Sequence, residues 1–120
     1  MKKTKTLGQL KKKAQIVFNA AMRKKLSYCI SCGGNNNLQA GHFYPVSTHE
    51  GLRFDEDNVW PECCRCNIFD EGHLINYADN LPGVIGQERF DALKARAAEY
   101  KRNGKKWSRS EIEEIIEKYS

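Results

Sequence analysis

The sequence predicts an α+β fold: a small zinc-stapled core with a basic helix before it and further helices after it. Two Cys-x-x-Cys pairs are separated by thirty residues, and a lysine-rich amphipathic stretch precedes the first pair. Apolar residues recur at helical spacing after the second pair. We therefore expect an N-terminal helical arm at 1–26, a zinc-bound core at 27–82 and a C-terminal helical extension at 83–120.

The composition narrows the class of protein. A chain of 120 residues buries a modest fraction of its surface, so a bound metal would help it to fold. Its five cysteines are an odd number, which argues against a disulfide framework. The lysine-rich start lacks the apolar stretch that would follow it in a secretory signal, and no apolar run approaches the roughly 20 residues of a membrane span. These features favour a reduced, cytoplasmic protein.

Positive charge is concentrated at the start of the chain. Residues 1–49 contain nine Lys/Arg and no Asp or Glu, whereas residues 50–120 carry a net charge of −4, which together give the overall +5. Such a field attracts nucleic acid, although a solvated lysine-rich helix that keeps the protein in solution fits the same charge distribution.

A helix is predicted over residues 7–26. Leu10, Ala14, Val17 and Ala21 fall on one face at helical spacing. The opposite face would present basic side chains to DNA phosphates. These candidate DNA-binding residues are Lys11, Lys12, Lys13, Arg23, Lys24 and Lys25.

Short extended segments and three further helices are predicted for the rest of the chain. Residues 38–44 are expected to pair as a hairpin with residues 52–54. A helix over 74–81 is expected to stop at Pro82. Two more helices span 87–102 and 109–119, and their apolar faces serve either as monomer core or as a dimer interface.

Four cysteines are predicted to bind one structural Zn²⁺. Each pair forms a tight turn that directs two sulfurs to one point, and four thiolates leave no open position for catalysis. A redox role is a weaker alternative, because neither pair lies in a βαβ pattern. Cys64 is left out, since its inclusion would break the spacing of the second pair. The predicted ligands are Cys29, Cys32, Cys63 and Cys66.

Several polar residues near the cysteines are candidates for a second site. A neutral imidazole at His42 could activate water, and a structural role is the alternative. Asn58 and Asn67 are either turn or capping residues or members of the same site. His73 is either a surface residue or a metal-facing imidazole, next to Asp70-Glu71, whose carboxylates suit Mg²⁺ or Mn²⁺.

The motifs occur in a definite order along the chain. They are Cys29-Ile-Ser-Cys32, Gln39-Ala-Gly-His42-Phe-Tyr, Leu52-Arg-Phe54, Asn58, Cys63-Cys-Arg-Cys66-Asn67, Gly72-His73 and Tyr77. This order resembles the zinc-containing HNH, or ββα-metal, nucleases, and more closely the NinG (also called Rap) family of phage recombination proteins. The resemblance covers about residues 27–95 and implies an HNH-like, treble-clef-like core.

The resemblance implies a metal-dependent, structure-specific DNA endonuclease in the cytoplasm of a bacterial host. Its substrates would be branched recombination intermediates such as Holliday junctions and D-loops. His42 would be the general base, and Asn67 would bind the catalytic Mg²⁺ or Mn²⁺. Asn58 would orient the His42 ring through a hydrogen bond.

One position departs from the HNH pattern. Those nucleases carry an acidic metal ligand just before the histidine, where this chain has Gly41. Either another group supplies this ligand, with His73 as the first candidate and Asp70 or Glu71 next, or His42 itself binds the metal and another group activates water. An alternative class is a zinc-ribbon module that binds DNA or another protein without cutting. A two-fold dimer would suit a junction that needs two symmetric cuts.

Overall fold

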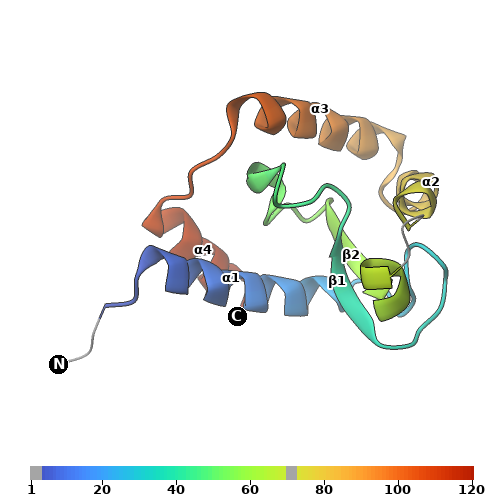
Figure 1. The fold of residues 1–120 in the computed structure, drawn as a ribbon, viewed down its shortest axis with the longest axis horizontal. Helices are drawn as coiled ribbons and strands as arrows, with labels where there is room; N and C mark the ends of the chain where they lie inside the picture. The colour runs from blue at the N-terminus through green and yellow to red at the C-terminus, as the bar shows by residue number, and fades with distance from the viewer. Residues whose placement is uncertain (1–3, 70–72) are drawn as a thin grey trace.

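The computed structural model describes residues 4–69 and 73–120, in which helices surround a two-stranded β-ribbon (Figure 1). The elements are α1 (Leu7–Met22), β1 (Leu38–His42), the 3₁₀-helix η1 (Glu50–Leu52), β2 (Val59–Cys63), the π-helix η2 (Arg65–Phe69), α2 (His73–Ile85), α3 (Gln87–Asn103) and α4 (Arg109–Tyr119). This mixture of helices with one small sheet confirms the predicted α+β class. Within the described residues, no helix combines the length and the apolar character needed to cross a membrane.

The ribbon pairs β1 with β2, in antiparallel register from Leu38 opposite Cys63 to His42 opposite Val59. The predicted pairing of β1 with residues 52–54 is therefore wrong. Residues 50–52 instead form η1, which the ion pair between Glu50 and Arg53 stabilises at the i, i+3 spacing of a helical turn.

Pro61 lies within β2, although proline disrupts most strands. Its carbonyl accepts a hydrogen bond from the backbone N–H of Ile30, so this residue directs its backbone polar groups away from β1. The missing N–H of proline therefore costs the ribbon no hydrogen bond.

Two helix boundaries differ from those predicted. Helix α1 ends at Met22 rather than residue 26, and the following turn brings the Lys25 ammonium to 3.6 Å from the centre of the Trp60 ring. Helix α2 continues through Pro82 to Ile85. An internal proline costs about 3 kcal/mol, but the added turn buries Ile85 in the core, and Gly86, at φ +90°, then ends the helix.

The two faces of the ribbon pack against different helices. On one face Val59 joins Phe18 of α1 and Ile112 of α4 in an apolar cluster. On the other face Trp60 joins an apolar cluster built mainly from α2 and α3. Each face of the ribbon therefore has its own hydrophobic core.

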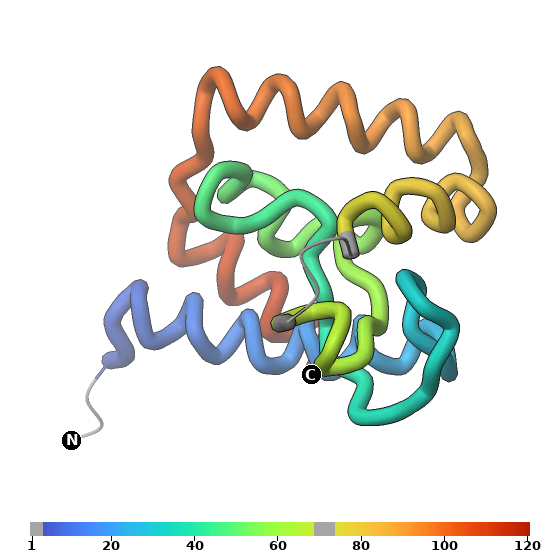
Figure 2. The backbone as a smooth tube through the Cα atoms, turned by 45° about the vertical axis from the view of Figure 1, so that its right-hand side comes forward, coloured from blue at the N-terminus to red at the C-terminus, as the bar shows by residue number. Residues whose placement is uncertain are grey.

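Helices α1 and α4 lie side by side although they are far apart in sequence (Figures 1 and 2). The segments predicted as an arm and an extension thus contact each other, while the division into three parts stays a prediction. The fully buried Leu93 and Ile112 show that the apolar faces of α3 and α4 contribute to the monomer core.

Candidate metal centre and nucleic-acid interface

The sulfurs of Cys29, Cys32, Cys63 and Cys66 all lie within 4.8 Å of one another. The Sγ atoms of Cys32 and Cys63 are 3.6 Å apart. A tetrahedral zinc with Zn–S bonds of about 2.3 Å requires sulfurs about 3.8 Å apart. The cluster therefore has the dimensions of a four-thiolate metal site, and Cys64 lies outside it, as the spacing predicted.

Backbone N–H groups surround these sulfurs. The N–H of Cys32 donates to the sulfur of Cys29, and the N–H of Gly34 donates to that of Cys32, each at 3.4 Å. The N–H of Cys66 lowers the pKa of Cys63. Burial and the neighbouring sulfurs raise the pKa of Cys66, so a cation is needed before all four can be thiolates.

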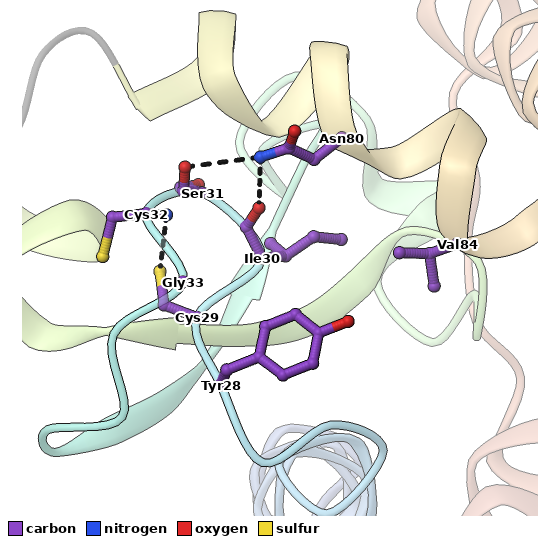
Figure 3. A pocket seen from close by; sticks show the side chains of 8 residues that line it. All are labelled: Tyr28, Cys29, Ile30, Ser31, Cys32, Gly33, Asn80 and Val84. Atoms are coloured by element: carbon purple, nitrogen blue, oxygen red, sulfur yellow. Dashed lines mark hydrogen bonds between the residues drawn. The ribbon is translucent and has the colours of Figure 1, made fainter.

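The turn that carries Cys29 and Cys32 is tied to α2 (Figure 3). The side-chain amide of Asn80 donates to the carbonyls of Ile30 and Ser31, at 2.7 and 3.4 Å. A hollow of about 400 Å³ opens beside this turn, with the half-exposed ring of Tyr28 on its wall. Asn80 thus fixes the first cysteine pair against the helix that follows the second.

His42 lies at the end of β1, and its Nε2 is 3.1 Å from the backbone carbonyl of Arg53. A carbonyl can only accept, so Nε2 carries the hydrogen and Nδ1 keeps its lone pair. Burial lowers the pKa of His42, the Arg53 carbonyl opposes this change, and the Arg53 charge adds to it. The ring is therefore neutral near pH 7 and able to accept a proton at Nδ1.

Asn58 is fully buried and does not make the predicted hydrogen bond to the His42 ring. Its side chain accepts from the N–H of Tyr44 at 2.8 Å and donates to the carbonyls of Tyr44 and Leu52, at 3.1 and 3.3 Å. Both N–H bonds of the amide and its oxygen are therefore hydrogen-bonded to backbone groups. Asn58 holds the loop whose Arg53 carbonyl contacts His42, so any effect on the ring is indirect.

Asn67 follows Cys66 in η2, and its side-chain amide donates to Oε1 of Gln39 at 2.9 Å. Gln39 lies opposite Glu62 on the ribbon face that carries Trp60, whereas His42 lies opposite Val59 on the other face. The structure therefore places Asn67 beside Gln39 and does not bring it to His42. The side chain of His73, and residues Asp70 and Glu71, are outside the described part of the chain.

No role was assigned from the sequence to two fully buried polar residues, Glu62 and Tyr77. The Glu62 carboxylate is fully buried and accepts a hydrogen bond from the Ser31 hydroxyl at 2.7 Å. The Tyr77 hydroxyl, also buried, donates to the carbonyl of Gly41 at 2.8 Å. A lone carboxylate within the apolar run of β2 was the available signal for Glu62.

The basic residues of α1 and of the turn after it divide into two groups. Lys12 and Lys13 are exposed and, with Lys5, line a shallow hollow of about 340 Å³; Arg23 and Lys24 are exposed as well. In contrast, Lys11 forms an ion pair with Glu50.

Lys25 also has a structural role within the molecule. Its ammonium lies over the Trp60 ring and donates to the carbonyl of Glu56. Burial lowers its pKa to about 8, an effect that the nearby carboxylates of Glu56 and Asp57 partly oppose. The predicted phosphate contacts of Lys11 and Lys25 therefore compete with contacts inside the fold.

We expect the double substitution Lys12→Ala/Lys13→Ala to weaken binding to DNA of any sequence. Each phosphate contact contributes about 0.9 to the slope of log affinity against log salt, so the slope should fall by up to about 1.8. Fluorescence anisotropy over a salt series measures this slope. Lys11→Ala is the matched control and should change it little, because Lys11 is paired with Glu50. An unchanged salt slope in the double variant would show that Lys12 and Lys13 do not contact DNA.

Together, the fold and the site define a small α+β protein with a cluster of four cysteines, at the end of a β-ribbon, that could hold a metal ion. The model of the family described as "Bacteriophage Lambda NinG protein" matches residues 1–120. The chain belongs to the NinG family.

Three curated relatives, each called "Protein ninG", show how far this similarity extends. The chain is 36% identical over 112 residues to that of Escherichia phage 933W, 34% to that of Escherichia phage lambda and 33% to that of Salmonella phage P22. In each case the match covers 90% of this chain and 52–53% of the relative. The chain thus spans about half the length of the curated relatives it matches. No solved structure shows a significant match to it.

Proposed function

We propose that this protein is a metal-dependent DNA endonuclease that cuts branched recombination intermediates. The observation that carries the proposal is the state of His42. Its Nε2–H donates to the Arg53 carbonyl. Burial lowers the pKa of the ring and keeps it neutral, so Nδ1 is available as a general base. The same carbonyl would stabilise the imidazolium formed when Nδ1 takes a proton from the attacking water.

The polar groups beside the cysteine cluster fit a catalytic divalent metal. The Asn67 amide of η2 donates to Oε1 of Gln39 on β1, so two side chains with amide oxygens are neighbours there, and Mg²⁺ and Mn²⁺ prefer oxygen ligands. His73 is a further proposed ligand. When bound, such an ion would neutralise charge on the scissile phosphate and on the leaving 3′-oxygen.

The exposed basic residues of α1 and of the turn after it support binding to DNA through the DNA backbone. Contacts from Lys12, Lys13, Arg23 and Lys24 to phosphates would position the substrate without reading bases. Selection by branch shape would then come from where these contacts fall relative to His42. A two-fold dimer would provide the two cuts that a four-way junction requires.

The test is cleavage of linear, forked and four-way DNAs of matched sequence, each with Mg²⁺ and then with Mn²⁺. We expect cleavage of the branched substrates at positions near the branch, and much slower cleavage of the linear duplex. Absence of cleavage on every branched substrate in both metals would contradict the nuclease proposal.

A second candidate is a zinc-containing module that binds DNA or a protein partner without cutting. The absence of a side chain at Gly41 favours it, as does the separation of Asn67 from His42 on opposite ribbon faces. The same panel distinguishes the two functions. Salt-dependent binding to branched DNA with no cleavage would support the binding module.

A further inference from the structure

The space above Gly41 is filled by the side chain of Glu62. A Cβ atom added to Gly41 would lie 2.9 Å from Cγ and 2.8 Å from Cδ of Glu62, with Oε1 closer still. These approaches are shorter than real side chains allow, so residue 41 has to be glycine while Glu62 keeps this position. The Glu62 carboxylate thus occupies the place where a side chain on residue 41 would begin.

The backbone brings this carboxylate next to the proposed general base. Gly41 and His42 are consecutive in β1, so their Cα atoms are only about 3.8 Å apart. Their positions belong to opposite faces of the ribbon, but in the described residues the outer edge of β1 is not paired with another strand. A phosphate lying along that edge would be reached from one face by His42 and from the other by a metal bound to the Glu62 carboxylate.

The neighbours of Glu62 supply further oxygen ligands. Gln39 lies directly opposite Glu62 on the same ribbon face, and its Oε1 is joined to the Asn67 amide. The register and these contacts therefore place one carboxylate and two side-chain amides at neighbouring positions near the cysteine cluster. This is the ligand type of a hard divalent cation rather than of zinc.

Glu62 is also firmly positioned. Its Oε2 accepts from the Ser31 hydroxyl within the first cysteine turn. Its charge is close enough to Tyr77 to raise the pKa of that hydroxyl, together with the larger effect of burial. Buried charges in proteins are paired or coordinate metals. Ser31 lies between Cys29 and Cys32, so a metal in the cysteine centre would hold this partner of Glu62 in place.

We propose that Glu62 binds the divalent metal of this site, delivering from β2 the carboxylate that Gly41 cannot provide from β1. This inference rests on the proposed nuclease function, but it concerns metal binding and can be tested without DNA. Gly41 and Glu62 then act as a reciprocal pair, in which the missing side chain of one makes room for the carboxylate of the other.

The test measures Mn²⁺ binding to the zinc-loaded full chain by electron paramagnetic resonance. Glu62→Gln keeps the size of the side chain and an oxygen that can accept from Ser31, so we expect unchanged zinc content and thermal unfolding. Mn²⁺ affinity should fall at least tenfold. Asp79→Asn, the same chemical change on the exposed side of α2, is the matched control and should bind Mn²⁺ as the wild type does.

Moving the carboxylate from residue 62 to residue 41 by mutation distinguishes metal binding by Glu62 from a purely structural role. The double variant Gly41→Asp/Glu62→Ala should recover Mn²⁺ binding relative to Glu62→Ala alone. Gly41→Asp alone should be destabilised, because its side chain meets Glu62. Wild-type affinity in Glu62→Gln, no recovery in the double variant, or no Mn²⁺ binding by the wild type would each overturn the proposal.

The two proposals fail in different ways. Mn²⁺ binding that depends on Glu62, without cleavage of any branched DNA, would support the metal site and contradict the nuclease function. Cleavage by a Glu62→Gln variant at the wild-type rate would support the nuclease function and contradict the role of Glu62.

Discussion

Replacing Cys63 by serine is expected to abolish zinc binding and to unfold the domain. Cys63 ends β2 and is buried among the other three sulfurs, so the substitution removes one ligand from the only described group that fits a tetrahedral thiolate site. Structural zinc contributes about 10–16 kcal/mol to folding in zinc-finger peptides, which is as large as the whole stability of most domains, roughly 5–15 kcal/mol. Zinc content and circular dichroism melting measure the two losses.

Cys64→Ser is the matched control for this prediction. It makes the same chemical change one residue later, at a half-buried cysteine outside the cluster, and should retain both zinc and the folded state. Chelation of zinc from the wild type should reproduce the effect of Cys63→Ser. A Cys63→Ser protein that stays folded with a full complement of zinc would show that the zinc assignment is wrong.

Replacing His42 by alanine is expected to leave zinc and DNA binding intact and to abolish cleavage. A positioned general base contributes about 10²–10⁴-fold to the rate, so cleavage of a four-way junction should slow by at least about 100-fold. His42→Gln is a useful companion, because its amide N–H can replace the donor to the Arg53 carbonyl but cannot accept a proton. Single-turnover cleavage, beside anisotropy for DNA binding, measures both quantities.

The pH dependence of the wild type gives a second measurement of the same residue. A general base acts when deprotonated, and burial lowers the pKa of His42 from its ordinary value of 6.5. The acid side of the kcat/KM profile should therefore fall only below about pH 6.5, and both His42 variants should lack this limb. A wild-type limb well above that pH, or rapid cleavage by His42→Gln, would exclude His42 as the base.

The cysteine centre shows how much local sequence can predict. A Cys-x-x-Cys pair needs only a tight turn to direct two sulfurs to one point, so its geometry is contained in a few adjacent residues. The same holds for most helix boundaries, such as the end of α3 at Gly104, whose φ of +67° suits glycine. Where a distant contact outweighed a local signal, as at Pro82, the prediction failed.

The sequence by itself determined the α+β class, the four-cysteine centre and the exclusion of Cys64 from it, because each depends on residue spacing within short segments. Only the tertiary structure decided the partner of β1, the backbone bonds of Asn58 and the separation of Asn67 from His42. It also revealed that Glu62 fills the space above Gly41. These features arise when segments far apart in the chain pack together, and a spacing pattern carries no information about which side chain will occupy the space that another leaves.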